Sequence, residues 1–212
     1  MCTGRVDLEF VLRAFSKGMD GVFIGGCRLN ECNYITHGNF QALSMVFLCK
    51  KIMRYIGLNP DRLRIEFMTS GDGMLFAEIV NNFVKKVKEL GPLGKGEGIG
   101  EHDLKSRLEA VTNLVPYIRL VERERLRVKF DNAEKYKEFY DSAELDKLFQ
   151  ETIGDKIAIS QIIVLLREKP LTTGEIAESL GFNPSEVSKY LNNSARQGLI
   201  RFDESQKRFV PA

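Results

Sequence analysis

The sequence predicts an α/β protein with a partial doubly wound parallel sheet, incomplete at the N-terminus, followed by a helical linker segment and a small winged-helix domain. Two patterns lead to this prediction. Over residues 1–94, helical and strand patterns alternate in the order helix, strand, helix, strand, helix, which is typical of parallel strands joined by crossover helices. Over residues 157–212, three helical patterns and a ribbon follow one another as in a winged helix-turn-helix.

The elements of the first region follow from the spacing of apolar residues. A first helix is expected over residues 6–15, where these apolar residues recur at helical spacing: Val6, Phe10, Val11 and Ala14. Residues 22–24 form a short apolar run, typical of a strand covered on both faces. The remaining elements are expected to be a helix over 40–56, a strand over 63–68 and a helix over 74–90.

Two strands do not complete a doubly wound sheet, because such a sheet needs several strands buried on both faces. The chain also opens on Cys2-Thr3-Gly4-Arg5, which resembles a strand-to-helix turn with no strand before it. We therefore expect the missing strands to come from another polypeptide or from upstream of the assigned start.

The middle of the chain is expected to connect two domains. Residues 91–100 are rich in glycine and predict a flexible linker, since they follow a helix and lack the Gly-Lys-Ser/Thr ending of a phosphate loop. The charged helical residues that follow predict a solvated bracket. The expected boundaries are 1–94 for the α/β domain, 95–156 for the linker segment and 157–212 for the winged helix.

The C-terminal region is expected to hold helices over 157–167, 175–180 and 185–197 and a ribbon from residue 198. Thr172 and Glu175 have the spacing of a capping box. Residues 157–212 contain seven basic and six acidic residues, and this net charge is low for a module that binds phosphates. We therefore expect a protein-docking or structural role rather than a nucleic-acid partner, although Asn and Arg on the third helix leave base contacts open.

Composition limits the remaining classes. The 212 residues carry a net charge of +2 and are 43% hydrophobic, as in ordinary globular proteins. No apolar run approaches the length of a membrane span and no signal peptide is visible, which predicts a cytoplasmic protein without a membrane partner. Four cysteines in a reducing compartment are more often free or metal-bound than paired.

Three cysteines predict a metal centre. Cys27 and Cys32 flank four residues after the first strand, and two preceding glycines leave room for an inorganic group. Cys2 follows the inferred missing strand, and neighbouring parallel strands lie only about 5 Å apart. We expect Cys2, Cys27 and Cys32 to converge on a soft metal centre, with zinc and a redox dithiol as open alternatives. Cys49 lies within a helix and is expected in the core.

Five stretches carry a resemblance to a known family: residues 1–7, 25–34, 38–39, 58–64 and 76–83. Together they resemble the delta subunit of methyl-viologen-reducing hydrogenase over about 94 residues. The resemblance implies a non-catalytic electron-transfer subunit with a 2Fe-2S cluster on Cys2, Cys27 and Cys32. It also implies partners: a nickel–iron hydrogenase or formate dehydrogenase as donor, and the flavin-bearing subunit of heterodisulfide reductase as acceptor, in methanogens and related anaerobes.

The chain departs from the family pattern in one respect. Full-length members begin with a strand and a turn of the form Cys-Cys-x-x-Cys, which has no equivalent here, and a 2Fe-2S cluster normally takes four protein ligands. Either a partner completes the set, or this chain does not hold the cluster alone. In the expected centre, the amides of Gly25 and Gly26 donate to cluster sulfurs, and Arg5 and Arg28 raise the potential. The alternative is a redox- or metal-responsive winged-helix DNA-binding regulator.

Overall fold

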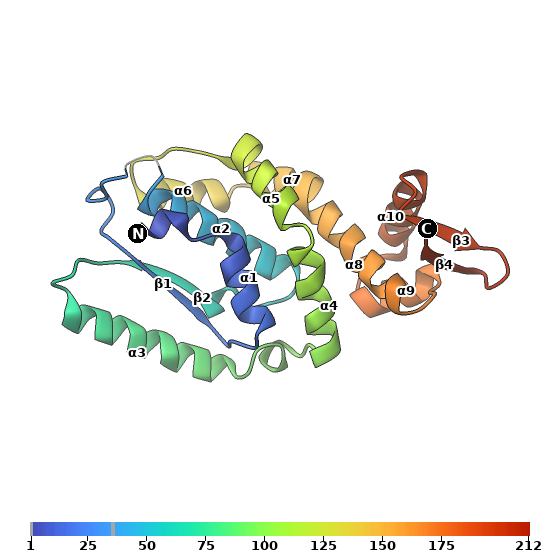
Figure 1. Ribbon diagram of the computed structural model, residues 1–212, viewed down its shortest axis with the longest axis horizontal. Coiled ribbons are helices and arrows are strands. Elements are labelled where there is room, and N and C mark those ends of the chain that lie inside the picture. The colour runs from blue at the N-terminus through green and yellow to red at the C-terminus, as the bar shows by residue number, and fades with distance from the viewer. Residues whose placement is uncertain (1, 35–36) are drawn as a thin grey trace.

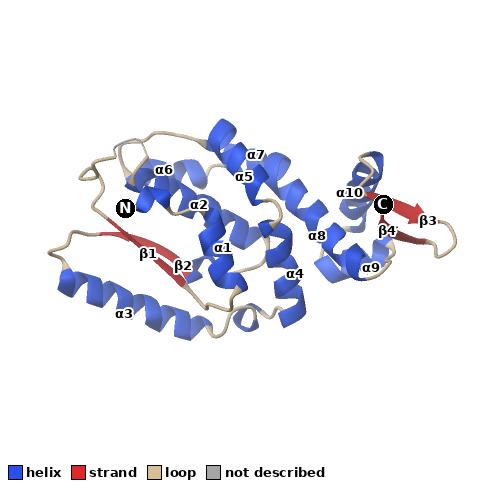
Figure 2. Ribbon diagram, viewed as in Figure 1, coloured by secondary structure: helices blue, strands red, loops and turns tan. Residues whose placement is uncertain are grey.

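Helices dominate the fold, and the strands form two separate two-stranded sheets (Figure 2). The computed structural model describes residues 2–34 and 37–212 (Figure 1). The helices and turns before the second half of the chain are η1 (Thr3–Arg5), α1 (Leu8–Ser16), α2 (Asn39–Tyr55), η2 (Pro60–Arg62), α3 (Gly73–Leu90) and η3 (Lys95–Glu97). Those that follow are α4 (Glu101–Thr112), α5 (Val115–Val121), η4 (Glu122–Leu126), α6 (Ala133–Tyr140), α7 (Ala143–Phe149), η5 (Gln150–Gly154), α8 (Asp155–Glu168), α9 (Thr173–Leu180) and α10 (Pro184–Arg196).

The first sheet is parallel. Strands β1 (Val22–Gly26) and β2 (Leu63–Phe67) pair along their whole length, and α2 is the crossover between them. In Figure 1, α3 lies on one face of this sheet and α1 and α2 on the other. The ring of Phe23 contacts the rings of Phe76 and Phe83 on α3, with centroids 6.3 and 5.7 Å apart. The predicted α/β order is thus confirmed, whereas a doubly wound topology stays a prediction.

The first helix begins later than predicted. Asp7 caps α1 by accepting the backbone N–H of Glu9, so that the helix runs from Leu8. Its buried face carries Leu8 and Phe15, while Phe10 is 60% exposed. Of the apolar residues that predicted this helix, Val11 is buried and Phe10 is not, because the buried face consists of Leu8, Val11, Leu12 and Phe15 at positions i, i+3, i+4 and i+7.

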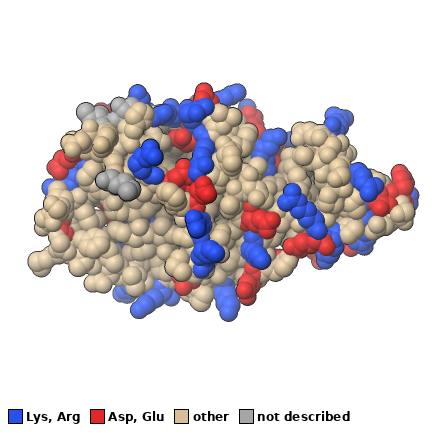
Figure 3. Space-filling view, viewed as in Figure 1, with Lys and Arg blue, Asp and Glu red and all other residues tan. Residues whose placement is uncertain are grey.

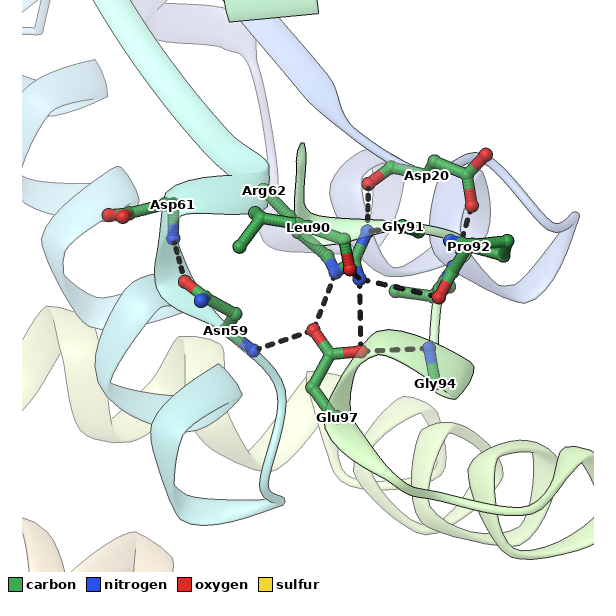
Figure 4. Close-up of polar contacts among 10 residues, drawn as sticks. Asp20, Asn59, Asp61, Arg62, Leu90, Gly91, Pro92, Gly94 and Glu97 are labelled. Carbon is green, nitrogen blue, oxygen red and sulfur yellow. Dashed lines mark hydrogen bonds and ion pairs between the residues drawn. The ribbon is translucent and has the colours of Figure 1, made fainter. Parts of the chain in front are cut away.

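The glycine-rich segment 91–100 is anchored rather than free (Figure 4). Arg62, whose side chain is completely buried, reaches into it and binds Glu97 at 2.6 Å from Nε to Oε1. The same guanidinium donates to the carbonyls of Asp20 and Gly91 at 3.0 and 2.8 Å. The predicted flexible linker is therefore wrong, since a buried ion pair fixes this segment to η2.

Glu97 also accepts backbone N–H groups from Asn59 and Gly94, at 3.2 and 2.9 Å (Figure 4). Burial pulls the pKa of Glu97 upward, but the hydrogen bonds from Arg62 and the backbone outweigh it and hold the pKa below the ordinary value of 4.5. The carboxylate is therefore charged in the folded protein at neutral pH.

The helices from α4 to η5 complete the first hydrophobic core instead of forming a solvated bracket. Their buried apolar side chains join those of α1, α2, β1 and β2 in one cluster. Phe40 and Phe47 of α2 stack on Tyr136 and Tyr140 of α6, with centroids 5.6 and 5.5 Å apart. The high charge of this segment lies on the outer faces of helices whose inner faces are apolar.

The C-terminal region has a second core of its own. Helices α8 to α10 pack with strands β3 (Ile200–Asp203) and β4 (Arg208–Pro211), which form an antiparallel hairpin. Thr172 and Glu175 make the predicted capping box at the start of α9. Helix α8 joins the two cores, because Ile157 packs in the first and Ile162 in the second. In the described part of the chain, no helix combines the length and apolarity needed to cross a membrane.

Candidate metal centre

Two chain segments that are far apart in the sequence bring thiols together at the carboxyl end of β1. Cys27 is the first residue after this strand, and Cys32 lies five residues further along the loop. The turn η1 lies alongside, with the Thr3 hydroxyl donating to the Gly25 carbonyl at 3.0 Å. This contact places Cys2 Sγ 3.8 Å from Cys32 Sγ. The structure thus brings Cys2 close to the cysteine loop, as the sequence predicts.

Each of the three sulfur atoms has a nitrogen donor within sulfur hydrogen-bond distance. The Gly4 amide lies 3.4 Å from Cys2 Sγ, and the Tyr34 amide lies 3.4 Å from Cys32 Sγ. The side-chain amide of Asn39 lies 3.9 Å from Cys27 Sγ. Such donors stabilise a thiolate, which is the form of cysteine that binds metal.

The pKa values of Cys32 and Cys27 are shifted in opposite directions. Partial burial pulls the pKa of Cys32 upward, but the amides of Tyr34 and Asn39 and the two other thiols outweigh it and lower the pKa. The pKa of Cys27 is raised, first by partial burial and then by the hydrogen bond and charge of Cys32 and the charge of Cys2. Cys32 therefore loses its proton more readily than Cys27.

Asn39 orients the loop, a role that sequence reasoning did not assign. This buried residue begins α2, and its side-chain amide donates to the carbonyls of Cys27 and Arg28 at 2.9 and 2.7 Å. It therefore holds the start of the cysteine loop against the helix. The available signal was an asparagine next to Gly38 at the expected start of a helix, a position where a polar side chain binds nearby backbone.

Two glycines permit the close approach of η1 and the loop. A Cβ atom at Gly38 would overlap Cys32 Sγ and the Tyr34 carbonyl. A Cβ atom at Gly4 would overlap the His37 carbonyl. These two positions need glycine because the backbone and the cysteine side chains pack without space for a methyl group.

Arg28 does not act as a free charge near the thiols. It makes a forked ion pair with Asp72, at 3.0 and 2.9 Å, at the turn between β2 and α3. The backbone N–H and hydroxyl of Thr69 also bind Asp72, and together with Arg28 they lower its pKa. The expectation that Arg28 raises a cluster potential is therefore weakened, because Asp72 balances its charge.

The other candidate ligands lie elsewhere or bind other groups. Cys49 is completely buried in α2, as predicted, and burial raises the pKa of its thiol to about 12. His37 accepts a hydrogen bond from Arg127, and His102 is exposed near Glu168. Across residues 2–34 and 37–212, no group of three or more His, Cys, Asp or Glu side chains surrounds a single ion position. The three thiols therefore do not form a ready-made site for one ion.

Comparison with known proteins gives this region a family. Residues 1–91 match the family described as methyl-viologen-reducing hydrogenase, delta subunit. The vhu iron-sulfur subunit of the F420-non-reducing hydrogenase of Methanococcus maripaludis is 43% identical over 91 residues, which are 43% of this chain and 67% of that protein. The chain belongs to this delta-subunit family.

Two further relatives show the settings in which the region occurs. The iron-sulfur subunit of the F420-non-reducing hydrogenase of Archaeoglobus profundus is 40% identical over 91 residues, 43% of this chain and 66% of that protein. One subunit of the ferredoxin/F(420)H(2)-dependent CoB-CoM heterodisulfide reductase of Methanosarcina acetivorans is 46% identical over 94 residues. That match covers 44% of this chain but only 12% of the reductase protein.

The C-terminal region has a separate likeness. Residues 160–201 match the family described as bacterial regulatory protein, arsR family. The matched segment runs from α8 to the start of β3 and thus contains the helix-turn-helix. The family regions at the two ends of the chain leave residues 92–159 between them.

Proposed function

We propose that this delta-subunit relative is an electron-transfer subunit that holds an iron–sulfur cluster of the 2Fe-2S type. The observation that carries the proposal is the 3.8 Å approach of Cys2 Sγ to Cys32 Sγ, between segments separated by a helix and a strand. Relatives named as iron-sulfur subunits are 40% and 43% identical to this chain over 91 residues, which supports the same assignment.

The donor set fits a cluster better than it fits a single ion. Thiolates are the ligands that iron–sulfur clusters take, and a two-iron cluster spreads its ligands over two metals rather than one. Cys2, Cys27 and Cys32 would hold such a cluster, and Cys49 would not, because it is enclosed in the core. The fourth ligand is then a group from a partner or from a chain that supplies further strands of the sheet.

Each residue around the thiols has a part in this proposal. A bound cluster accepts and releases one electron at a time. The amides of Gly4 and Tyr34 hydrogen-bond the sulfurs of Cys2 and Cys32 and favour the charged thiolates. Asn39 fixes the backbone on which Cys27 sits. No acid, base or nucleophile is required of the chain, so we do not propose a catalytic residue.

The partners follow from the relatives. The matched region occurs in a relative named as a hydrogenase iron-sulfur protein and also within a much longer relative named as part of a heterodisulfide reductase. We propose that this chain receives electrons from a nickel–iron hydrogenase or a formate dehydrogenase. It would deliver them to the flavin-bearing subunit of heterodisulfide reductase, in the reducing cytoplasm where free thiols persist.

The test is to purify the full chain anaerobically together with co-expressed hydrogenase and heterodisulfide reductase subunits. Iron and acid-labile sulfide per chain are measured, and the electron paramagnetic resonance spectrum is recorded after reduction. We expect a reduced 2Fe-2S signal that Cys27→Ser removes. The matched control is Cys49→Ala, which leaves the signal in place because that sulfur is not a ligand.

A functional assay completes this test. Cys27→Ser should abolish electron delivery to the reductase while hydrogen oxidation with an artificial dye continues, since the dye bypasses this protein. Zinc in place of iron, or an iron content unchanged by Cys27→Ser, would contradict the proposal.

The alternative of a winged-helix DNA-binding regulator is not favoured. The arsR-family match supports a helix-turn-helix in this chain, but fold does not determine function. Residues 157–212 carry seven basic and six acidic side chains, which is a weak charge for phosphate binding. We therefore propose a protein-docking or structural role for this region.

A further inference from the structure

A cleft opens directly beside the thiols. Its volume is about 1040 Å³, and Cys2 lines it together with the exposed side chains of Arg5 and Tyr34. The opposite wall belongs to α5, η4 and the residue after η4, through three arginines: Arg119, Arg123 and Arg127. A group bound in the cleft therefore lies next to a thiol of the candidate metal centre.

Two of the arginines are already neutralised within the chain. Arg119 binds Asp7 and Glu9, each at 2.7 Å, and Arg123 binds Glu124 at 2.8 Å. In Figure 3, acidic and basic side chains accordingly lie close together over α1, and basic side chains continue toward α5 at the upper edge of this face. These pairs shape the wall but leave little charge for a ligand.

The other two arginines that line the cleft are Arg5 and Arg127. Among the described residues, no ion pair involves Arg5 or Arg127, and both side chains are exposed. Arg127 hydrogen-bonds His37, which does not cancel a positive charge. Glu122 is the one carboxylate among the described residues of the lining, and it accepts a hydrogen bond from Gln41 at 2.8 Å. Among the described residues that line the cleft, four arginines stand against this one carboxylate, whereas Asp7, Glu9 and Glu124, which bind Arg119 and Arg123, lie outside the lining. The surplus of positive charge is therefore confined to the lining itself.

We infer that this cleft is the docking site for an acidic segment of the electron-transfer partner, an inference that rests on the proposed function for the identity of that partner. Its volume is at or above the upper limit of about 1,000 Å³ for small-molecule sites. Gly4 lines it, but packing against the His37 backbone already accounts for this glycine, so no phosphate loop is indicated. An acidic protein segment fits the charge surplus, and complementary charge speeds the encounter of transient partners.

The two walls come from different parts of the chain. The family match ends at residue 91, so the thiol side belongs to the delta-subunit region and the arginine wall to the helices after it. The first core joins these helices to the sheet, which fixes the wall in place. The added helices thus give this chain a docking surface that its family region alone does not carry.

The experiment measures binding of a fluorescein-labelled peptide of eight glutamates to the full chain by fluorescence anisotropy. We expect binding at about 20 mM NaCl that weakens strongly by about 300 mM, because salt screens exposed charges. The double variant Arg5→Gln/Arg127→Gln should bind at least about tenfold more weakly, since each lost charged hydrogen bond is worth roughly a factor of ten. The matched control is Arg196→Gln/Arg201→Gln, with two exposed arginines of the C-terminal region, and should change the affinity less than about twofold.

Three results would overturn the inference: unchanged binding by the cleft variant, equal loss in the control variant, or displacement of the peptide by free flavin mononucleotide. The last would make the cleft a nucleotide site. Iron content is measured separately on the chain co-purified with its hydrogenase and reductase partners, because a partner completes the proposed ligand set. A complex without iron, together with a chain that binds the peptide through Arg5 and Arg127, would contradict the proposed cluster and leave the docking site standing. A complex with iron, together with a chain that does not bind the peptide, would overturn the docking site and leave the cluster standing.

Discussion

The described part of the molecule contains two sheets of two strands each, and they are stabilised in different ways. The parallel pair β1–β2 joins residues about forty positions apart in the sequence. The helices that pack over it come from segments before and after it in the chain, as far as η5 and Ile157. The antiparallel pair β3–β4 is a hairpin whose core lies entirely within residues 158–210. A parallel pair needs a crossover and cover on both faces, whereas a hairpin forms locally.

Each region also has one arginine–glutamate pair whose glutamate caps a turn or helix. In the first, Arg62 and Glu97 have side chains that are 0% and 9% exposed. In the second, Arg208 and Glu175 are 36% and 40% exposed. The same chemistry therefore has different consequences, because water screens the second pair and replaces it easily when it is broken.

The largest expected effect is at Arg62. Arg62→Met removes the guanidinium and leaves the Glu97 carboxylate buried without a counter-charge, with the backbone N–H groups of Asn59 and Gly94 as its remaining partners. This should cost about 3–5 kcal/mol of the free energy of unfolding. Urea unfolding followed by circular dichroism measures this. Arg64→Met is the matched control: Arg64 lies on the next strand and its pair with Glu66 is about one-third exposed, so the cost should stay below about 1 kcal/mol. Equal losses in the two variants would contradict the contrast between buried and exposed pairs.

A smaller effect is expected from pH. Because the pKa of Glu97 is lowered on folding, its contribution to stability is fully present above its ordinary pKa of 4.5. The contribution is lost as the pH falls through the lowered pKa of the folded state. The urea concentration at the unfolding midpoint of the wild-type protein should therefore decrease as the pH is lowered below about 4.5. The midpoint of Glu97→Gln should be lower than that of the wild type at neutral pH and should decrease less steeply. Parallel pH profiles for the two proteins would show that Glu97 is not the responsible group.

The smallest effect is expected in the C-terminal region. Thr172→Ala removes the side-chain acceptor of the capping box and should cost about 1 kcal/mol. Thr173→Ala, at the next position and inside the helix, is the control and should cost less. Thermal unfolding measures both, and a larger cost for Thr173→Ala would contradict the assigned cap.

The sequence predicted local elements well and tertiary roles less well. The elements from β1 to α3 and the three C-terminal helices begin and end within two residues of their predicted limits, because apolar spacing, caps and glycines determine them locally. Segment 91–100 was misjudged, because its glycines are typical of a linker and the partner that fixes them, Arg62, lies about thirty residues earlier. In α1, Phe10 was among the apolar residues that predicted the helix, but the buried face is formed by Leu8, Val11, Leu12 and Phe15.

At the candidate metal centre, too, some features could be predicted from the sequence and others could not. The cysteines and their place after a strand are visible in the sequence, and so is the likeness to the delta-subunit family. The sequence does not show that Asn39 holds the cysteine loop or that α5, η4 and the residue after η4 supply arginines to a cleft beside Cys2.

By itself, then, the sequence determined which residues form helices and strands and where the cysteines lie relative to them, since both depend on neighbours along the chain. Only the tertiary structure decided that Asn39 holds the cysteine loop and that the middle helices belong to the first core. The physical reason is that these outcomes depend on packing and buried ion pairs between residues far apart in sequence, and local patterns carry no record of such partners.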